Sequence, residues 1–156
     1  MKRVLGMIFA MLTMVAIALG ADNTLGTWKY NAGKSKQAPG VSPIASLTVT
    51  REAADGGAKI STKGERADGS KIENSYAPKY DGKAVPVTGA GLTWDTVAFK
   101  QVNDNSITEE RSKKGGTYHS TVQDVVSKDG KTMTATIKGT GSDGKAFTAV
   151  AVFDKQ

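Results

Sequence analysis

Apolar and polar residues alternate along most of this chain. In residues 132–137, Met133, Ala135 and Ile137 fall on one side of an extended backbone, and three threonines fall on the other. A period of two residues is typical of a β-strand with one face in a core and one in solvent. The near-continuous apolar runs of a parallel sheet are missing, so the pattern predicts antiparallel strands. The same alternation occurs in residues 47–50 and 117–124.

Tight turns separate the alternating runs at a fairly regular spacing. Asp-Gly favours two-residue hairpin turns, because these turns need residues with positive φ. Asp-Gly or Gly-Gly turns lie at residues 55–57, 68–69, 81–82, 115–116, 129–130 and 143–144. Between the turns we predict strands at residues 25–31, 44–53, 57–66, 71–80, 83–88, 94–103, 106–114, 117–127, 131–139 and 145–154.

This many strands in one small domain cannot remain a single flat sheet. Closing an up-and-down meander into a barrel removes its exposed edges. The alternative is a two-sheet sandwich, which needs longer crossover connections than these turns supply. We therefore predict an all-β domain whose antiparallel meander closes into a single barrel of eight to ten strands. Residues 32–43, rich in Gly, Ser, Lys and Pro, are expected to form a loop, either a lid over a barrel mouth or a plain connection.

Residues 1–20 have the pattern of a secretory signal peptide. Lys2 and Arg3 precede an apolar run that ends in Ala18-Leu19-Gly20, which offers small residues for cleavage before Ala21. An uncleaved anchor is the alternative, but the run is short for the ~20 residues that a membrane span needs. We expect cleavage, export to the periplasm or the medium, a single domain of residues 21–156, and no membrane span after cleavage.

Composition narrows the partners further. The 156 residues include no cysteine, which excludes disulfides and lipid attachment at a cysteine. Of the 21 Lys and Arg residues, Lys2 and Arg3 belong to the leader, which leaves 19 against 15 acidic residues and a net charge of +4. Most lysines are scattered beside turns, whereas a nucleic-acid site needs a clustered basic stripe with stacking aromatics. No nucleic-acid partner is therefore expected.

Few residues suggest catalysis, a metal or a cofactor. Residues 139–144 match Gly-x-Gly-x-x-Gly, but a strand-like run follows instead of the helix that a dinucleotide site needs. His119 is the sole histidine, and the adjacent Glu109 and Glu110 point to opposite faces of a strand. We expect no metal, no cofactor and no enzymatic activity. An enzyme on the same scaffold is the least favoured alternative, and it would lose turnover on His119→Ala.

The two ends of the domain resemble a known group of barrels. Gly26-Thr27-Trp28 resembles the Gly-x-Trp signature of lipocalins and fatty-acid-binding proteins, the calycin group, and the closing run "AVFDKQ" resembles the last strand of fatty-acid-binding proteins. More narrowly, "GTWKYNAGKSKQAPG", "YDGKAVPVTG" and "VVSKDGKTMT" are similar to small exported bacterial lipocalin-like proteins without an assigned function. The resemblance implies a lipocalin-like barrel in which Trp28 is a structural plug and Gly26 permits a tight bend.

The sequence departs from these patterns in two places. Lipocalins often pack an arginine from near the chain end over the tryptophan, but the last arginine here is Arg111. Either Arg111 takes this role from another strand, or the cap is absent. Fatty-acid-binding proteins commonly hold a carboxylate with Arg-x-Tyr on the last strand, where this chain has Ala151 and Phe153. The resemblance therefore does not imply fatty-acid binding.

Candidate ligand contacts come from residues whose strand faces could point inward. Ile107, Glu109 and Arg111 share one face. If that face lies inside the barrel, the two charges must be paired and could orient a polar ligand group; otherwise they lie at a wet rim. Further aromatic candidates, which either line a cavity or fill the core, are Tyr76, Trp94, Phe99 and Tyr118.

The expected function is non-catalytic binding of a small, mostly apolar ligand inside the barrel of an exported protein. The alternative is a barrel with a packed core and a structural or protein-interaction role in the cell envelope. The sequence predicts neither the ligand nor the oligomeric state.

Overall fold

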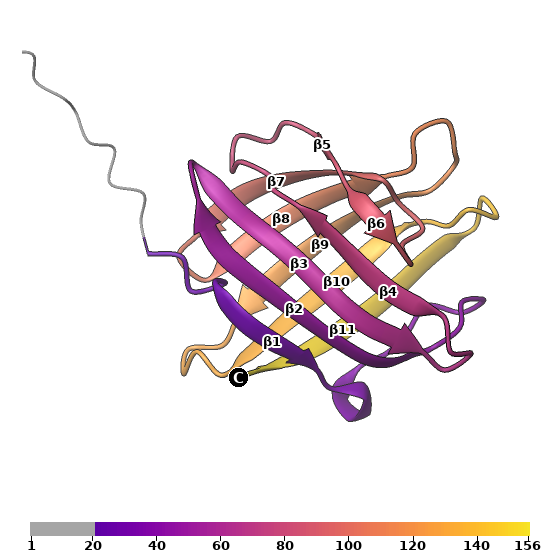
Figure 1. The fold of residues 1–156 in the computed structure, drawn as a ribbon, viewed down its shortest axis with the longest axis horizontal. Helices are drawn as coiled ribbons and strands as arrows, with labels where there is room; N and C mark the ends of the chain where they lie inside the picture. Colours follow the sequence, from indigo (N-terminus) through magenta and orange to yellow (C-terminus); the bar gives the residue numbers. More distant parts are fainter. Residues whose placement is uncertain (1–20) are drawn as a thin grey trace, which may run out of the picture.

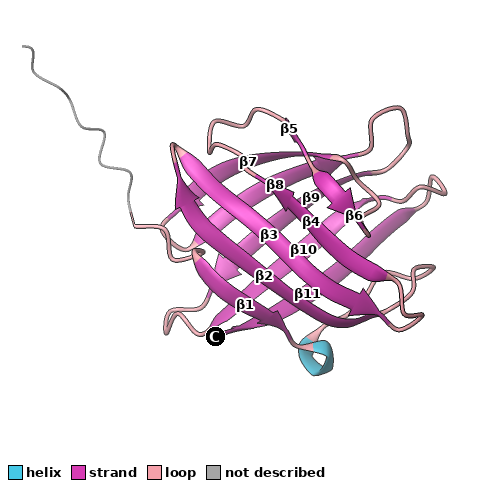
Figure 2. Cartoon of the chain, viewed as in Figure 1, coloured by secondary structure: helices cyan, strands magenta, loops and turns pink. Residues whose placement is uncertain are grey.

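The computed structural model describes residues 21–156 as a nearly closed antiparallel β-barrel (Figures 1 and 2). The predicted leader, residues 1–20, lies outside the described residues. Within residues 21–156, the eleven strands are β1 (Gly26–Tyr30), β2 (Ile44–Ala54), β3 (Gly57–Arg66), β4 (Lys71–Tyr76), β5 (Val85–Pro86), β6 (Thr88–Ala90), β7 (Thr96–Asn103), β8 (Ser106–Ser112), β9 (His119–Val126), β10 (Thr132–Thr140) and β11 (Ala146–Lys155). A short 3₁₀ turn, η1 (Ala32–Lys34), follows β1.

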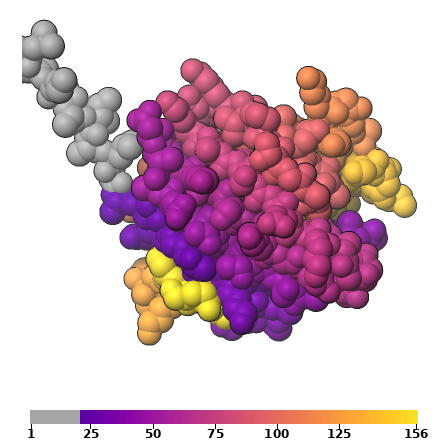
Figure 3. Space-filling model, in the orientation of Figure 1, coloured from indigo at the N-terminus to yellow at the C-terminus, as the bar shows by residue number. Residues whose placement is uncertain are grey.

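The strand order shows how the meander closes. The sheet runs β5-β7-β8-β9-β10-β11-β1-β2-β3-β4-β6, so the chain's first and last long strands, β1 and β11, are neighbours. In the space-filling view, the yellow C-terminal residues lie directly beside the indigo N-terminal ones (Figure 3). The two edges of the sheet, β5 and β6, are consecutive in the chain. The short segment of residues 85–90 therefore pairs with β7 at its start and with β4 at its end.

The predicted all-β antiparallel barrel is confirmed, with one strand more than the expected eight to ten. The predicted strand 83–88 is replaced by two short strands, because β5 pairs with β7 whereas β6 pairs with β4. Between them, the Val87 backbone N–H donates to the Asp95 carbonyl at 2.8 Å. The predicted strand 71–80 ends at Tyr76. Pro78 follows, and proline cannot donate to a ladder. Its carbonyl instead accepts from the Ala58 N–H at 3.1 Å.

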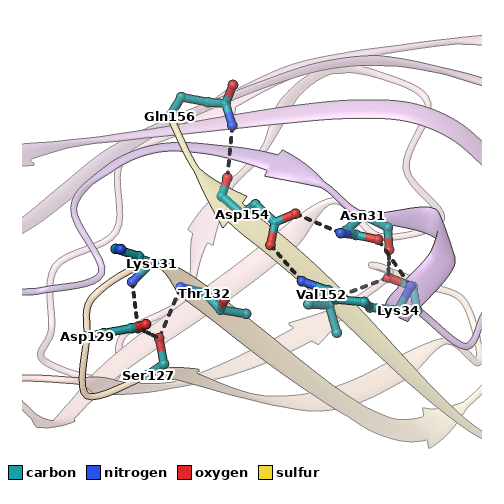
Figure 4. A network of polar contacts seen from close by, with 10 residues as sticks. Asn31, Lys34, Ser127, Asp129, Lys131, Thr132, Val152, Asp154 and Gln156 are labelled. Carbon is teal, nitrogen blue, oxygen red and sulfur yellow. Dashed lines mark hydrogen bonds and ion pairs between the residues drawn. The ribbon is translucent and has the colours of Figure 1, made fainter.

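Local hydrogen bonds fix the β9–β10 hairpin and the last strand (Figure 4). In the β9–β10 turn, the Asp129 carboxylate accepts from the Ser127 hydroxyl at 2.6 Å and from the Lys131 backbone N–H at 3.1 Å. On β11, the Asp154 carboxylate accepts from the Asn31 amide at 2.7 Å. These bonds help to hold β11 against the segment that follows β1, and so support the closure of the barrel.

Trp28 lies at one end of the barrel and is fully buried. Its indole N–H donates to the Thr24 carbonyl at 2.8 Å. The Lys155 ammonium, from the final strand, lies 4.8 Å from the centre of the indole ring, a distance at which a cation is attracted to the ring face. The alternative in which Arg111 covers Trp28 is therefore wrong: the arginine cap is absent, and Lys155 covers the ring instead. Arg111 instead lies 4.7 Å above the ring of Trp94.

The segment before β1 closes the same end. The Asn23 backbone N–H donates to the Asp104 carbonyl at 2.8 Å in the β7–β8 turn, and the Tyr80 hydroxyl donates to Asp22. Gly26 begins β1 with φ of 122°, a conformation that side chains disfavour. A Cβ there would stand 3.0 Å from the Lys155 side chain. Gly26 thus allows the chain to turn from this end into β1 beneath Lys155.

Inward-facing side chains fill much of the interior, as period-two alternation requires. The apolar members with no exposed surface come from β1, β3, β7, β8 and β9; they are Trp28, Ile60, Val97, Phe99, Ile107 and Val122. Across residues 21–156, no helix has the length and apolar character needed to cross a membrane.

Candidate functional site

A cavity of about 670 Å³ occupies the barrel interior and reaches the end opposite Trp28. Its rim is formed by residues of three connections: residues 36–41, residues 92–94, and residues 141–143 and 145 of the β10–β11 turn. These connections lie at one end because alternate turns of an antiparallel meander share an end. The volume falls within the range of about 300–1,000 Å³ typical of small-molecule sites.

The walls toward the rim are mostly apolar. Side chains from several strands contribute, so the apolar surface surrounds the cavity rather than covering one side. These wall residues are Tyr30, Ile44, Leu47, Val49, Ile72, Met133, Ala135, Ile137, Phe147 and Phe153.

Charged residues lie in the interior among these apolar walls. Arg51 enters from β2 and reaches across the barrel to β8 and β9. Its guanidinium donates to Glu109 at 3.0 Å and to Asp124. All three side chains are at least 95% buried, and buried charges are stable only when paired and hydrogen-bonded.

Arg111 completes this charged cluster, which we define as Arg51, Glu109, Arg111 and Asp124. Its Nε donates to Glu109 at 2.8 Å, and its Nη2 lies 2.6 Å from the same carboxylate oxygen. Glu109 therefore accepts from both guanidiniums through its two oxygens. The cluster carries two formal positive and two formal negative charges, so it is balanced when both carboxyl groups are ionised.

The two carboxyl groups respond differently to burial. Burial by itself raises the pKa of Glu109, but the guanidiniums of Arg111 and Arg51 outweigh it and hold that pKa below the usual value. Burial raises the pKa of Asp124 to about 7, and the Glu109 charge adds to this rise, while Arg51 opposes it. Asp124 is thus the carboxyl group in the cluster that takes up a proton near neutral pH.

Several buried side-chain atoms of two cavity-lining residues have no hydrogen-bond partner within residues 21–156. On Arg51 these atoms are Nε and Nη1, and on Asn74 they are both side-chain amide atoms, Nδ2 and Oδ1. Both residues are only 5% exposed. Buried polar groups are nearly always hydrogen-bonded in folded proteins, so these atoms mark a place where a polar partner would be stabilised.

The structure brings some of the predicted site residues to the cavity and places others behind it. Tyr76, Trp94, Arg111 and Tyr118 line it. Glu109 lies in the buried interior, not at a wet rim, and accepts from the two arginines.

Phe99 and Trp28 belong to the packed part of the described barrel, apart from the cavity lining. Phe99 lies 5.7 Å below the Arg51 guanidinium and packs edge-on against Tyr76. Phe99 therefore supports the site from outside it.

Sequence reasoning missed Arg51, Asp124 and Asn74. The signal for the first two was present, because Arg51 continues the Leu47–Val49 face and Asp124 continues the Tyr118–Val122 face. Period two carries both charged residues into the barrel together with the apolar side chains of their faces. Asn74 lies opposite Thr62 of β3, on the inward face of β4.

Two further predicted features can now be placed. The loop of residues 32–43 contributes residues 36–41 to the cavity rim, and its backbone is anchored by a Lys36–Val150 bridge to β11. His119 is exposed at the start of β9.

In comparisons with known proteins, no family model matches the chain, and no curated protein matches it either. The nearly closed antiparallel barrel is consistent with a calycin-like fold in general.

Proposed function

We propose that this protein is a non-catalytic binding protein that holds a small, mostly apolar ligand inside its barrel. The single observation that carries the proposal is the cavity of about 670 Å³, with apolar walls toward its rim and a buried polar cluster within. A few placed polar groups within a largely apolar pocket are typical of small-molecule sites. The apolar part of the ligand would be stabilised by about 25 cal/mol for each Å² removed from water.

The alternative, a packed barrel with a structural or interaction role, is less well supported. Side chains fill the interior around Trp28, as that alternative requires. Toward residues 36–41, however, the interior holds the cavity. A purely structural barrel gains stability by filling such a space, because each unfilled volume loses packing contacts.

Export and a lipocalin-like identity are part of the same proposal. They rest on the leader pattern of residues 1–20 and on Gly26-Thr27-Trp28. A binding protein outside the cell would meet its ligand in water, where a covered apolar cavity protects the ligand's surface.

Native mass spectrometry of the protein, purified without detergent from its own host, tests the proposal. A reproducible added mass that is released on denaturation supports binding and gives the ligand's mass. A second test titrates the purified protein with Nile red, a neutral dye that fluoresces in apolar surroundings. An unliganded mass together with failure of Nile red to bind would overturn the proposal and favour the structural alternative.

A further inference from the structure

The unpaired atoms of two cavity-lining residues, Arg51 and Asn74, define what the ligand's polar part must supply. Arg51 Nε and Nη1 are donors that need acceptors. The Asn74 amide has an unpaired donor and an unpaired acceptor, so it needs both. A group that only accepts, such as an ester carbonyl, would leave Asn74 Oδ1 buried and unpaired.

The charge of the cluster restricts the ligand further. Each guanidinium already faces a carboxylate: Arg51 contacts Glu109 and Asp124, and Arg111 contacts Glu109. An anionic ligand group would add a negative charge to a balanced, buried set. A cationic group would meet two guanidiniums. An unbalanced charge of either sign costs free energy at this buried cluster.

We propose that the polar part of the ligand is uncharged, that it supplies both hydrogen-bond acceptors and at least one donor, as an amide does, and that it lies beside Arg51 and Asn74. This inference rests on the proposed binding function and specifies the ligand class that the site takes. The apolar part of the ligand then lies along the walls toward residues 36–41.

The protonation of Asp124 gives the proposal a pH signature. Arg51 from β2, Tyr76 from β4, and Glu109 and Arg111 from β8 face this carboxyl group, and Ala135 of β10 lies opposite it in the sheet register. Above the Asp124 pKa of about 7, the cluster is balanced. Below it, Asp124 becomes neutral, and the cluster has room for one negative charge.

The test compares three probes that share one acyl chain: decanamide, decanoate and methyl decanoate. Each displaces Nile red from the full protein at about pH 8, above the Asp124 pKa. We expect decanamide to act at concentrations roughly tenfold lower than decanoate, a difference that corresponds to one modest polar mismatch. Methyl decanoate should also bind less tightly than decanamide, because it cannot donate to Asn74. At about pH 6, the difference between the concentrations of decanamide and decanoate that displace Nile red should become smaller.

A variant assigns the effect to Asn74. Asn74→Leu keeps the volume and removes two atoms that have no partner within the described chain, so folding should not suffer. The variant should lower the affinity for decanamide to that for methyl decanoate. It should leave the affinity for methyl decanoate nearly unchanged. Ser106→Ala is the matched control, because Ser106 also carries a buried hydroxyl without a partner in residues 21–156, but it lies away from the cavity lining.

The outcomes separate this inference from the proposed function. Decanoate that binds as tightly as decanamide at about pH 8, or unchanged decanamide binding in Asn74→Leu, would overturn the uncharged polar group. Nile red binding that no probe displaces would also overturn it, while leaving the binding function intact. Failure of Nile red itself to bind would count against the binding function.

Discussion

Arg51 of β2 and Asp124 of β9 form an ion pair across the barrel interior, although 73 positions separate them in the chain. They belong to strands that are not neighbours in the sheet. The pair therefore joins opposite walls of the barrel. In the backbone hydrogen-bond ladder, β10, β11 and β1 lie between the two strands. The same guanidinium also contacts Glu109 on β8, so one side chain ties three strands together.

Removal of Arg51 should destabilise the barrel strongly. Arg51→Met leaves Asp124 buried without its cation, and breaking such a pair costs about 3–5 kcal/mol. Urea unfolding measures the change in the free energy of unfolding. The matched surface control is Lys71→Met, which breaks the exposed pair with Glu65 and should cost no more than about 1 kcal/mol.

A double variant checks that the loss in Arg51→Met comes from the unpaired charge. Arg51→Met with Asp124→Leu removes one charge of each sign and should recover most of the stability. If the two single changes instead add without recovery, packing rather than charge explains the effect.

The raised pKa of Asp124 predicts a pH dependence of stability. An unfolded aspartate has a pKa of about 3.9, whereas burial raises the pKa of Asp124 to about 7 in the folded protein. Between these values the folded state holds a proton that the unfolded state has released. The Asp124 contribution to stability therefore falls as pH rises through this window, by at most about 1.4 kcal/mol per pH unit.

Asp124→Asn isolates this effect because asparagine does not titrate. The variant's stability relative to the parent protein should rise from about pH 4 to about pH 7 and then level off. Asp129→Asn is the control: hydrogen bonds from Ser127 and Lys131 lower the pKa of this exposed carboxyl, so its effect should appear only at lower pH. Parallel pH profiles for Asp124→Asn and the parent protein would contradict the raised pKa.

Trp28 should matter for stability and not for ligand binding. Trp28→Phe loses the hydrogen bond to the buried Thr24 carbonyl, which we expect to cost about 1–3 kcal/mol. Lys155→Met loses the cation above the ring and should cost about 0.5–1 kcal/mol. Urea unfolding measures both changes. A marked loss of Nile red affinity in either variant would show that this end of the barrel takes part in binding.

The two tryptophans should report differently on the cavity. Trp94 lines it and lies beneath Arg111, whereas Trp28 is buried at the opposite end. A ligand that enters the cavity should therefore change the emission of Trp94. We expect Trp28→Phe to keep the ligand-induced fluorescence change and Trp94→Phe to lose it. The reverse result would place the ligand at the wrong end of the barrel.

The leader makes a prediction that a single measurement checks. Protein recovered from its own host should begin at Ala21, because Ala18-Leu19-Gly20 offers a cleavage site. Intact-mass analysis of the periplasmic and culture-medium fractions reads both the N-terminus and the location. Recovery of a species that begins at Met1, in the membrane fraction alone, would favour the uncleaved anchor.

The sequence by itself determined the strands and the inward faces. Alternation such as Met133, Ala135 and Ile137 settles which side of a strand faces the core, because successive side chains point to opposite faces. Asp-Gly turns settle where the chain reverses. Both signals are local, because each depends only on residues that are close together in the chain. They also suffice for the antiparallel meander, though not for the division of residues 83–88 into two strands.

Only the tertiary structure decided what the inward residues contact. Lys155 rather than Arg111 covers Trp28, because the final strand returns beside the first. The meeting of Arg51 with Asp124 depends on the register of every ladder between them, and no short stretch encodes that register. The same holds for the cavity. Whether inward side chains fill a barrel is set by how their volumes add across opposite walls, which strand periodicity does not specify.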